Sequence, residues 1–268
     1  MRINLGISPC PNDTFMFDAL INSKIDTQGI DFHVSYEDVE QLNQWAIEKR
    51  LDVTKVSFSA YTHCVEDYVL LNSGSAIGDN CGPLLIKKPE RVLDDSSLIA
   101  IPGRFTTANM LFSYAYPNYH NKATILFSDI EQKVESEEVD AGVIIHENRF
   151  TYMKRGLEKV KDLGKFWQEK TNLLIPLGGI IIKRCLSLKV KKTIDRLIRE
   201  SITFAFNNPS SSLDYIQSLS QEIDKDVLQS HIDLYVNKNS LSLNNKSKES
   251  IRKLFIMQNN KFKDIFVE

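Results

Sequence analysis

Short apolar runs alternate along the first part of the chain with segments whose apolar residues recur at helical spacing. The runs at residues 3–7, 30–36 and 52–58 predict strands, and residues 13–21 and 38–50 predict the helices between them. In the second of these strands every other residue is apolar, as expected when one face is buried. Strands that alternate with helices predict βαβ units and a mainly parallel sheet.

A second series with the same alternation follows the first along the chain. Strands are predicted at residues 97–103, 123–128 and 141–145, and helices at residues 106–116 and 130–136. Because this series repeats the βαβ pattern without any solenoid period, it predicts a second α/β lobe rather than a repeat array.

One more apolar run, at residues 177–184, is predicted to return to the first lobe, and the pattern after Ser187 is helical. The crossings near residues 87–92 and 173–178 are short and poor in glycine and serine, which suits a hinge rather than a flexible tether. We therefore predict a two-lobed α/β binding-protein fold with its ligand in a central cleft. The large lobe is expected to be discontinuous and the small lobe inserted: residues 1–91 with 175–268, and residues 92–174.

The composition is that of an ordinary globular protein, with 268 residues, 42% of them hydrophobic and 25% charged. A net charge of −2 gives no argument for binding nucleic acid. No apolar run approaches the ~18 residues of a membrane span, and the first residues lack the combined features of a signal peptide. We expect a cytoplasmic protein that binds neither nucleic acid nor membrane, whose state as a monomer or homodimer is open.

The four cysteines, Cys10, Cys64, Cys81 and Cys185, are widely separated and form no C-x-x-C pair. We expect free, mostly buried thiols, because no histidine stands at ligand spacing from any of them. No metal site is predicted. The dinucleotide pattern G-x-G-x-x-G is also absent from the sequence.

Polar residues follow four of the predicted strands at their carboxyl ends, where ligands bind in open parallel sheets. Ser8 ends the first strand and leads into PCPNDTF, Ser57 ends another, and PGRFTTAN follows a third. His146 follows the apolar run Gly142, Val143, Ile144 and Ile145. Four polar strand ends together favour a ligand site over a set of unrelated turns.

Two of these loops lead into helices, and each has a purely structural alternative. Thr106 or Thr107 is predicted to cap the third helix. The free N–H groups of its first turn, including that of Ala108, either bind an oxygen-rich acidic group of a ligand or are satisfied by the cap alone. In SPCPNDTF, Asn12 or Asp13 is predicted to cap the first helix, and the two prolines around Cys10 favour a shaped binding loop.

Lys55 and His146 are the charged and titratable candidates. Lys55 either lies at the surface or supplies positive charge to an acidic ligand. His146 either donates a hydrogen bond to a backbone carbonyl at the strand end or acts as a base, since an unperturbed imidazole is suited to proton removal near neutral pH.

The chain resembles one family in several segments taken together: SPCPNDTF (8–15), DVTKVSFSAY (52–61), PGRFTTA (102–108) and GVIIHENRFTY (142–152). The family is 1,4-dihydroxy-6-naphthoate synthase, of the futalosine route of menaquinone biosynthesis. The likeness extends over nearly the whole chain, including residues 39–57 and 231–241, with no departure within these segments.

This resemblance implies a periplasmic-binding-protein-like fold of type 2 and a cytoplasmic lyase without metal or organic cofactor. The substrate would be cyclic dehypoxanthinyl futalosine, cleaved to 1,4-dihydroxy-6-naphthoate and a three-carbon fragment, dihydroxyacetone. His146 matches the family's proton acceptor. The resemblance implies substrate-binding positions at Lys55, Val56 and Ser57 and at Thr106 and Thr107. The pattern of polar residues at the strand ends adds Ala108, Ser8, Asn12 and Asp13 as candidates.

Two alternatives share the predicted fold. One is the chorismate dehydratase of the same pathway, although HENRFTY (146–152) favours the naphthoate synthase. The other is a non-catalytic binding protein for an acidic metabolite, for which the export signal is missing. The group that orients His146, and whether His231, Tyr235 and Asn237 line the cleft, are open at this point.

Overall fold

The computed structural model describes residues 1–220, 224–259 and 264–267. The chain divides into two compact units, Met1–Gly78 with Pro176–Glu268 and Asp79–Ile175. The boundary between residues 175 and 176 falls within the predicted crossing at residues 173–178. The boundary between residues 78 and 79 lies before the predicted one at residue 91, because strand β6 (Leu84–Lys87) pairs with strands of the second unit.

The first unit is built on a six-stranded sheet of order β2-β1-β3-β11-β4, with β5 beside β11. β1 runs parallel to β2 and β3, as the βαβ pattern predicts. The mainly parallel sheet expected from the sequence is nevertheless wrong, because the returning strand β11 pairs antiparallel with β3 and β4. The strands are β1 (Arg2–Ile7), β2 (Asp31–Tyr36), β3 (Val53–Ser57), β4 (Tyr68–Leu70), β5 (Ala76–Gly78) and β11 (Ile175–Lys183).

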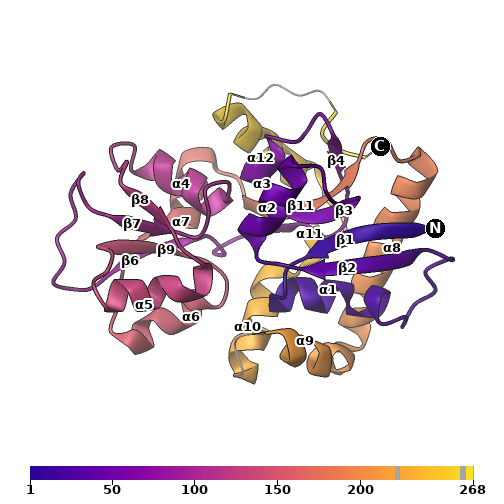
Figure 1. The fold of residues 1–268 in the computed structure, drawn as a ribbon, viewed down its shortest axis with the longest axis horizontal. Helices are drawn as coiled ribbons and strands as arrows, with labels where there is room; N and C mark the ends of the chain where they lie inside the picture. The colour runs from indigo at the N-terminus through magenta and orange to yellow at the C-terminus, as the bar shows by residue number, and fades with distance from the viewer. Residues whose placement is uncertain (221–223, 260–263, 268) are drawn as a thin grey trace. The chain divides into compact units, whose positions relative to one another are not determined.

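Helices cover this sheet on both faces (Figure 1). On one face α1 packs against α8, α9 and α10, and their apolar side chains join those of β1, β3 and β11 in one core. On the other face α3 packs against α2 and α12, where the rings of Tyr61 and Phe255 meet edge to face at 5.3 Å. The helices are α1 (Pro11–Ile21), α2 (Val39–Ile47), α3 (Phe58–Tyr61), α8 (Leu188–Asn207), α9 (Leu213–Leu219), α10 (Lys225–Tyr235), α11 (Lys238–Leu241) and α12 (Asn245–Met257).

The second unit has its own five-stranded sheet, of order β10-β6-β9-β7-β8. β7 is parallel to β8 and β9, whereas β6 is antiparallel to β9 and β10. Its core packs Ile130 and Val134 of α5 against this sheet. The remaining elements are β7 (Ile99–Ile101), β8 (Lys122–Thr124), β9 (Ala141–Ile144), β10 (Glu158–Asp162), α4 (Thr107–Ala115), α5 (Ile130–Glu135), α6 (Asn148–Thr151) and α7 (Leu163–Thr171).

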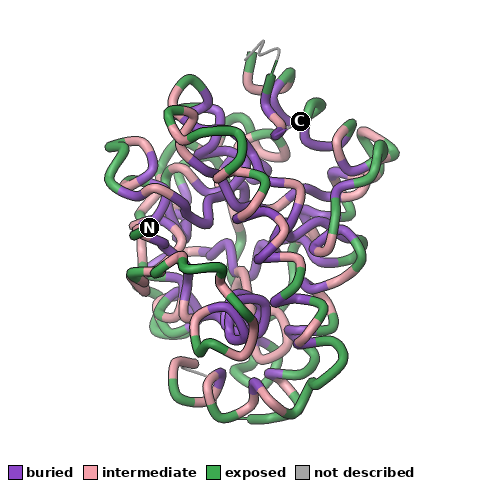
Figure 2. The backbone as a smooth tube through the Cα atoms, turned by 90° about the vertical axis from the view of Figure 1, so that its right-hand side faces the viewer, coloured by how far each residue is buried: buried purple, intermediate pink, exposed green. Residues whose placement is uncertain are grey.

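Buried residues are concentrated in the strands and on the inner sides of the helices, and exposed residues in the connecting loops (Figure 2). The four cysteines are free thiols, and three of them are buried, as predicted. Burial raises the pKa of the Cys64 and Cys81 thiols to about 12, which makes them poor nucleophiles. Across the described residues, every helix is too short or too polar to cross a membrane.

Candidate functional site

The loop between β1 and α1 is organised by the buried carboxylate of Asp13. Asp13 accepts hydrogen bonds from the backbone N–H of Ser8, at 3.2 Å, and from the Ser8 hydroxyl, at 2.8 Å. The cap of α1 differs from the prediction: Cys10 is the N-cap residue, and Pro11 takes the first helical position, where its missing N–H costs nothing. Asp13 therefore stands in the first turn, where the helix dipole favours its charge.

Lys55 forms an ion pair with Asp13 inside the first unit. The exposed fractions of the two side chains are 8% and 1%. Lys55 comes from β3 and is buried, so the sequence alternative that placed it at the surface is wrong. Two charges are removed from water here, and such a pair survives only if additional hydrogen bonds satisfy its remaining atoms.

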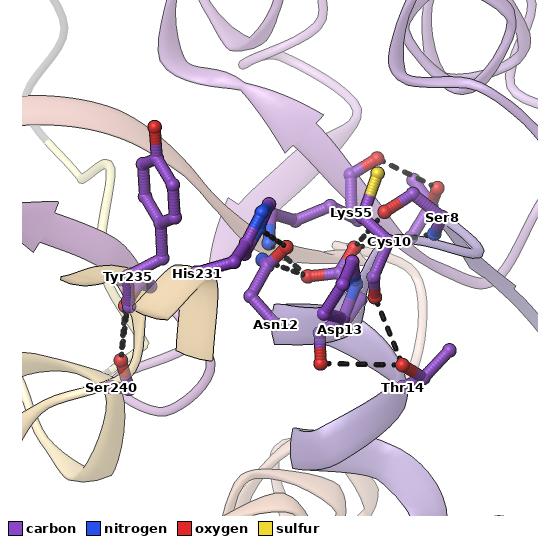
Figure 3. A network of polar contacts seen from close by, with 12 residues as sticks. Ser8, Cys10, Asn12, Asp13, Thr14, Lys55, His231, Tyr235 and Ser240 are labelled. Atoms are coloured by element: carbon purple, nitrogen blue, oxygen red, sulfur yellow. Dashed lines mark hydrogen bonds and ion pairs between the residues drawn. The ribbon is translucent and has the colours of Figure 1, made fainter. Parts of the chain in front are cut away.

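Asn12 and His231 extend this polar network (Figure 3). The Asn12 amide donates to Asp13 at 2.8 Å, and the Asn12 carbonyl oxygen lies 3.0 Å from Nε2 of His231. His231 belongs to α10 and is completely buried. The network thus joins the β1–α1 loop, β3 and α10 of the first unit.

The end of β3 is held by a residue that the sequence reasoning missed. Asn43 of α2 accepts a hydrogen bond from the Ser57 backbone N–H at 2.8 Å, and its amide lies 3.2 Å from the Ser57 hydroxyl. Beside them, a side chain at Gly178 would collide with the carbonyl oxygen of Val56. The segment from Lys55 to Ser57 is therefore closely fixed on both sides.

In the second unit Thr106 is the N-cap of α4, one of the two caps that the sequence allowed. Its hydroxyl accepts from the backbone N–H of Asn109, at 3.1 Å, and donates to the carbonyl of Gly103, at 2.8 Å. The hydroxyl therefore acts both as a donor and as an acceptor in bonds to the local backbone. Thr107 and Ala108 follow as the first two residues of α4, and both are buried.

His146 lies two residues beyond β9, with its backbone in the left-handed region at φ 56°. This conformation is uncommon for residues other than glycine, although histidine adopts it more readily than most. It breaks the strand alternation and turns the chain into α6. The imidazole packs on Phe127, with 4.9 Å between ring centroids and an interplanar angle of 62°.

Glu131 of α5 fixes the segment after His146 through two hydrogen bonds. Asn148 donates to Glu131 at 2.8 Å, and the Thr151 hydroxyl donates at 3.1 Å. A side chain at Gly142 would collide with Ile130, so β9 and α5 are in close contact just before His146. Glu131 is therefore a carboxylate that the sequence analysis did not identify and that positions the His146 turn.

Burial raises the pKa of Glu131, because desolvation outweighs the hydrogen bonds from Asn148 and Thr151. A raised folded-state pKa stabilises the fold fully below the unfolded pKa, and this contribution is lost as pH rises through the folded pKa. Glu131→Gln cannot ionise, so its stability relative to the original protein should improve as pH rises across that window. Urea unfolding at several pH values measures this difference. Glu135→Gln, at a half-exposed carboxylate of the same helix, is the control; a pH-independent difference for Glu131→Gln would contradict the prediction.

Within either unit taken by itself, the described residues offer no group of three histidine, cysteine or carboxylate side chains placed to ligate a metal ion.

The residues predicted from the sequence fall into two sets. Ser8, Asn12, Asp13 and Lys55 are joined in one network, with Val56 and Ser57 next to it, whereas Thr106, Thr107, Ala108 and His146 belong to the second unit.

The chain matches the family model described as "Menaquinone biosynthesis" over residues 3–260. It is 39% identical to the 1,4-dihydroxy-6-naphthoate synthase of Thermus thermophilus over 253 residues, which are 94% of this chain and 92% of the relative. It is 35% identical to the Streptomyces coelicolor protein of the same name, over 94% of this chain and 91% of that one.

Solved structures agree with the fold. A crystal structure of an Archaeoglobus fulgidus protein, 36% identical, superimposes with a TM-score of 0.92 over 96% of this chain and 97% of that one. The periplasmic aliphatic sulphonate binding protein of Escherichia coli has a TM-score of 0.64 at 10% identity, over 100% of this chain and 94% of its own. The second likeness concerns the fold alone, which is α/β and like that of periplasmic binding proteins.

Proposed function

The chain belongs to the 1,4-dihydroxy-6-naphthoate synthase family of menaquinone biosynthesis, and from this premise we propose that it is the lyase acting on cyclic dehypoxanthinyl futalosine. The products are 1,4-dihydroxy-6-naphthoate and a three-carbon fragment, dihydroxyacetone. The proposal includes the cytoplasmic location expected from the sequence, which cell fractionation tests.

The observation that carries the proposal is the placement of His146. Its imidazole follows a buried strand at a left-handed backbone position and packs on the ring of Phe127. The next segment is held by the hydrogen bond from Asn148 to Glu131. A base on a supported turn is pre-organised for proton transfer. The neutral imidazole removes a proton from the sugar-derived part of the substrate, and the electron pair released breaks the carbon–carbon bond and aromatises the ring. The imidazolium then returns its proton to the products, so the cleavage consumes no other reactant.

Lys55 is assigned to substrate binding. An ammonium group carries three N–H donors, and its bond to Asp13 uses one of them. Because Asp13 compensates the charge, Lys55 contributes directed hydrogen bonds to acidic oxygen atoms rather than a net positive field. Ser57 and the first turn of α4, with Thr107 and the backbone of Ala108, are assigned the same class of contact.

The two threonines at the start of α4 are expected to differ on replacement by valine, which keeps their shape. Thr106→Val removes the cap and should cost ~1 kcal/mol of stability. Thr107→Val should lower substrate affinity at least about tenfold, since a charge-assisted hydrogen bond is worth ~1.5–3 kcal/mol. Calorimetric titration and urea unfolding of both variants separate the two effects. Unchanged affinity in folded Thr107→Val would leave that hydroxyl without a binding role.

The proposed function is tested by incubating the purified protein with cyclic dehypoxanthinyl futalosine and, separately, with chorismate. Formation of 1,4-dihydroxy-6-naphthoate in the first reaction supports the proposal. Turnover of chorismate alone would make the chain the dehydratase, and tight binding without turnover of either compound would make it a binding protein. Chromatography with mass detection distinguishes all three results.

A further inference from the structure

Ser57 is the N-cap residue of α3, yet its side chain forms no cap hydrogen bond with that helix. A serine at this position usually accepts a hydrogen bond from a backbone N–H of the first helical turn. Here its hydroxyl is bonded instead to Asn43, a completely buried residue of α2. The usual role of an N-cap serine is therefore replaced by a contact with a second element, and this replacement calls for a chemical reason.

The contacts of Asn43 determine the orientation of its side-chain amide. The backbone N–H of Ser57 can only donate, so the Asn43 atom that lies 2.8 Å from it must be the carbonyl oxygen. The NH₂ group then lies 3.3 Å from a carboxylate oxygen of Glu40 and 3.2 Å from Oγ of Ser57. Both of these oxygens can accept, so the contacts agree on one orientation. Oγ of Ser57 is therefore the acceptor in its bond with Asn43.

A hydroxyl that accepts one hydrogen bond still has its own proton to donate. We propose that Asn43 is a positioning residue, which directs the Ser57 hydroxyl proton toward an acidic oxygen atom of the substrate. This inference rests on the proposed function, in which Ser57 contacts the substrate. Ser57 keeps 5% of its surface exposed and Asn43 none, so Asn43 acts on the substrate through Ser57 alone.

The surroundings of Ser57 hold it in place before any substrate binds. Asn43 bonds to both its backbone N–H and its hydroxyl, and on the other side Ser57 is paired with Gly178 of β11. A serine hydroxyl otherwise rotates freely about its C–O bond. Because Asn43 presents a donor to Oγ, the proton cannot turn toward α2, and less freedom is lost when a ligand binds.

An exchange of charge between Glu40 and Asn43 tests this role at constant net charge. In the double variant Glu40→Gln with Asn43→Asp, the carboxylate at position 43 still accepts from the Ser57 backbone N–H. The amide at position 40 donates to that carboxylate in turn. The carboxylate also accepts from the Ser57 hydroxyl, so the proton turns toward α2 and away from the substrate. Glu40→Gln alone keeps the Asn43 amide and is the matched control.

We expect the double variant to raise the KM for cyclic dehypoxanthinyl futalosine about tenfold, which corresponds to about 1.4 kcal/mol and to the loss of one hydrogen bond to a charged group. The kcat should change little, because the lost contact holds the substrate equally in the ground state and the transition state. Glu40→Gln alone should keep the KM within about threefold of the original value. Equal KM values in the double variant and this control would overturn the proposal.

Ser57→Ala distinguishes an effect through the hydroxyl from a general disturbance of the fold. It should itself raise the KM about tenfold, and adding the charge exchange to it should raise the KM by no more than about a further threefold. A further tenfold increase in the Ser57→Ala background would show that Asn43 acts independently of this hydroxyl, and it would overturn the proposal. Circular dichroism and urea unfolding confirm that each variant is folded before it is compared.

Neutron diffraction from deuterium-exchanged crystals of the original protein tests the same inference without any substrate. A deuterium atom on Oγ of Ser57 that points away from Asn43 supports the proposal; one that points toward Asn43 overturns it, also when no variant folds. If the original protein does not turn over the substrate, the proposed function fails while the direction of the hydroxyl remains measurable, so the two failures are distinguishable.

Discussion

Replacing His146 by asparagine is expected to lower turnover of cyclic dehypoxanthinyl futalosine by about 10²–10⁴-fold, the usual contribution of a positioned general base. Asparagine keeps hydrogen-bonding capacity and tolerates the left-handed backbone at this position, but it cannot take up the proton. Substrate binding should therefore survive in the variant. Steady-state kinetics measures turnover, and calorimetric titration measures binding.

The pH–rate profile adds a second readout for His146. Only neutral imidazole is the base, so the rate of the original protein should rise with pH through one ionisation, and this limb should be absent from His146→Asn. Phe127→Leu, which removes the ring beside His146 and leaves the imidazole in place, is the comparison variant and should keep the limb. A folded His146→Asn protein with the original turnover would show that the base lies elsewhere.

Replacing Lys55 by methionine is expected to destabilise the protein by ~3–5 kcal/mol, because the buried carboxylate of Asp13 would lose its cation. Methionine preserves the length of the side chain, so the loss reflects charge rather than volume. Asp13→Asn in the same background removes the uncompensated charge and keeps an acceptor for Ser8. The double variant should therefore be more stable than Lys55→Met alone.

Urea unfolding of the original protein, both single variants and the double variant closes this cycle. Lys183→Met breaks the partly exposed ion pair between Lys183 and Asp52 on the neighbouring strand β11, and it serves as the matched control. Its cost should be no more than about 1 kcal/mol, as for most exposed pairs. Equal costs for Lys55→Met and Lys183→Met would contradict a buried, charge-compensating role for Lys55.

Local sequence signals predicted most elements of both units. The alternation at residues 30–36 corresponds to β2, a partly exposed strand at the edge of its sheet, and Thr106 caps α4 as one of the two allowed residues. These features depend on neighbours within a few positions, so periodicity and capping chemistry contain enough information to predict them. The predicted cap of α1 failed because Pro11 suits the first helical position and moves the cap back to Cys10.

The sequence reasoning missed Asn43 and Glu131 and left the role of His231 open, and all three are buried polar or charged residues. Asn43 and His231 are polar residues within the apolar faces of α2 and α10, and Glu131 is a buried carboxylate on α5. A polar residue inside an apolar stripe could have been found as a signal. Its partner could not, because Asn12 and His231 are 219 positions apart and Ser57 and Asn43 are 14 apart.

By itself the sequence determined the alternation of strands and helices, the resemblance to a family, and the candidates Lys55 and His146. Only the tertiary structure decided that Lys55 is buried against Asp13 and that Glu131 supports the turn at His146. It also decided that β6 belongs to the second unit and that β11 runs antiparallel. The physical reason is that pairing, register and charge compensation are made by segments distant in the chain, and no local pattern specifies which of them meet.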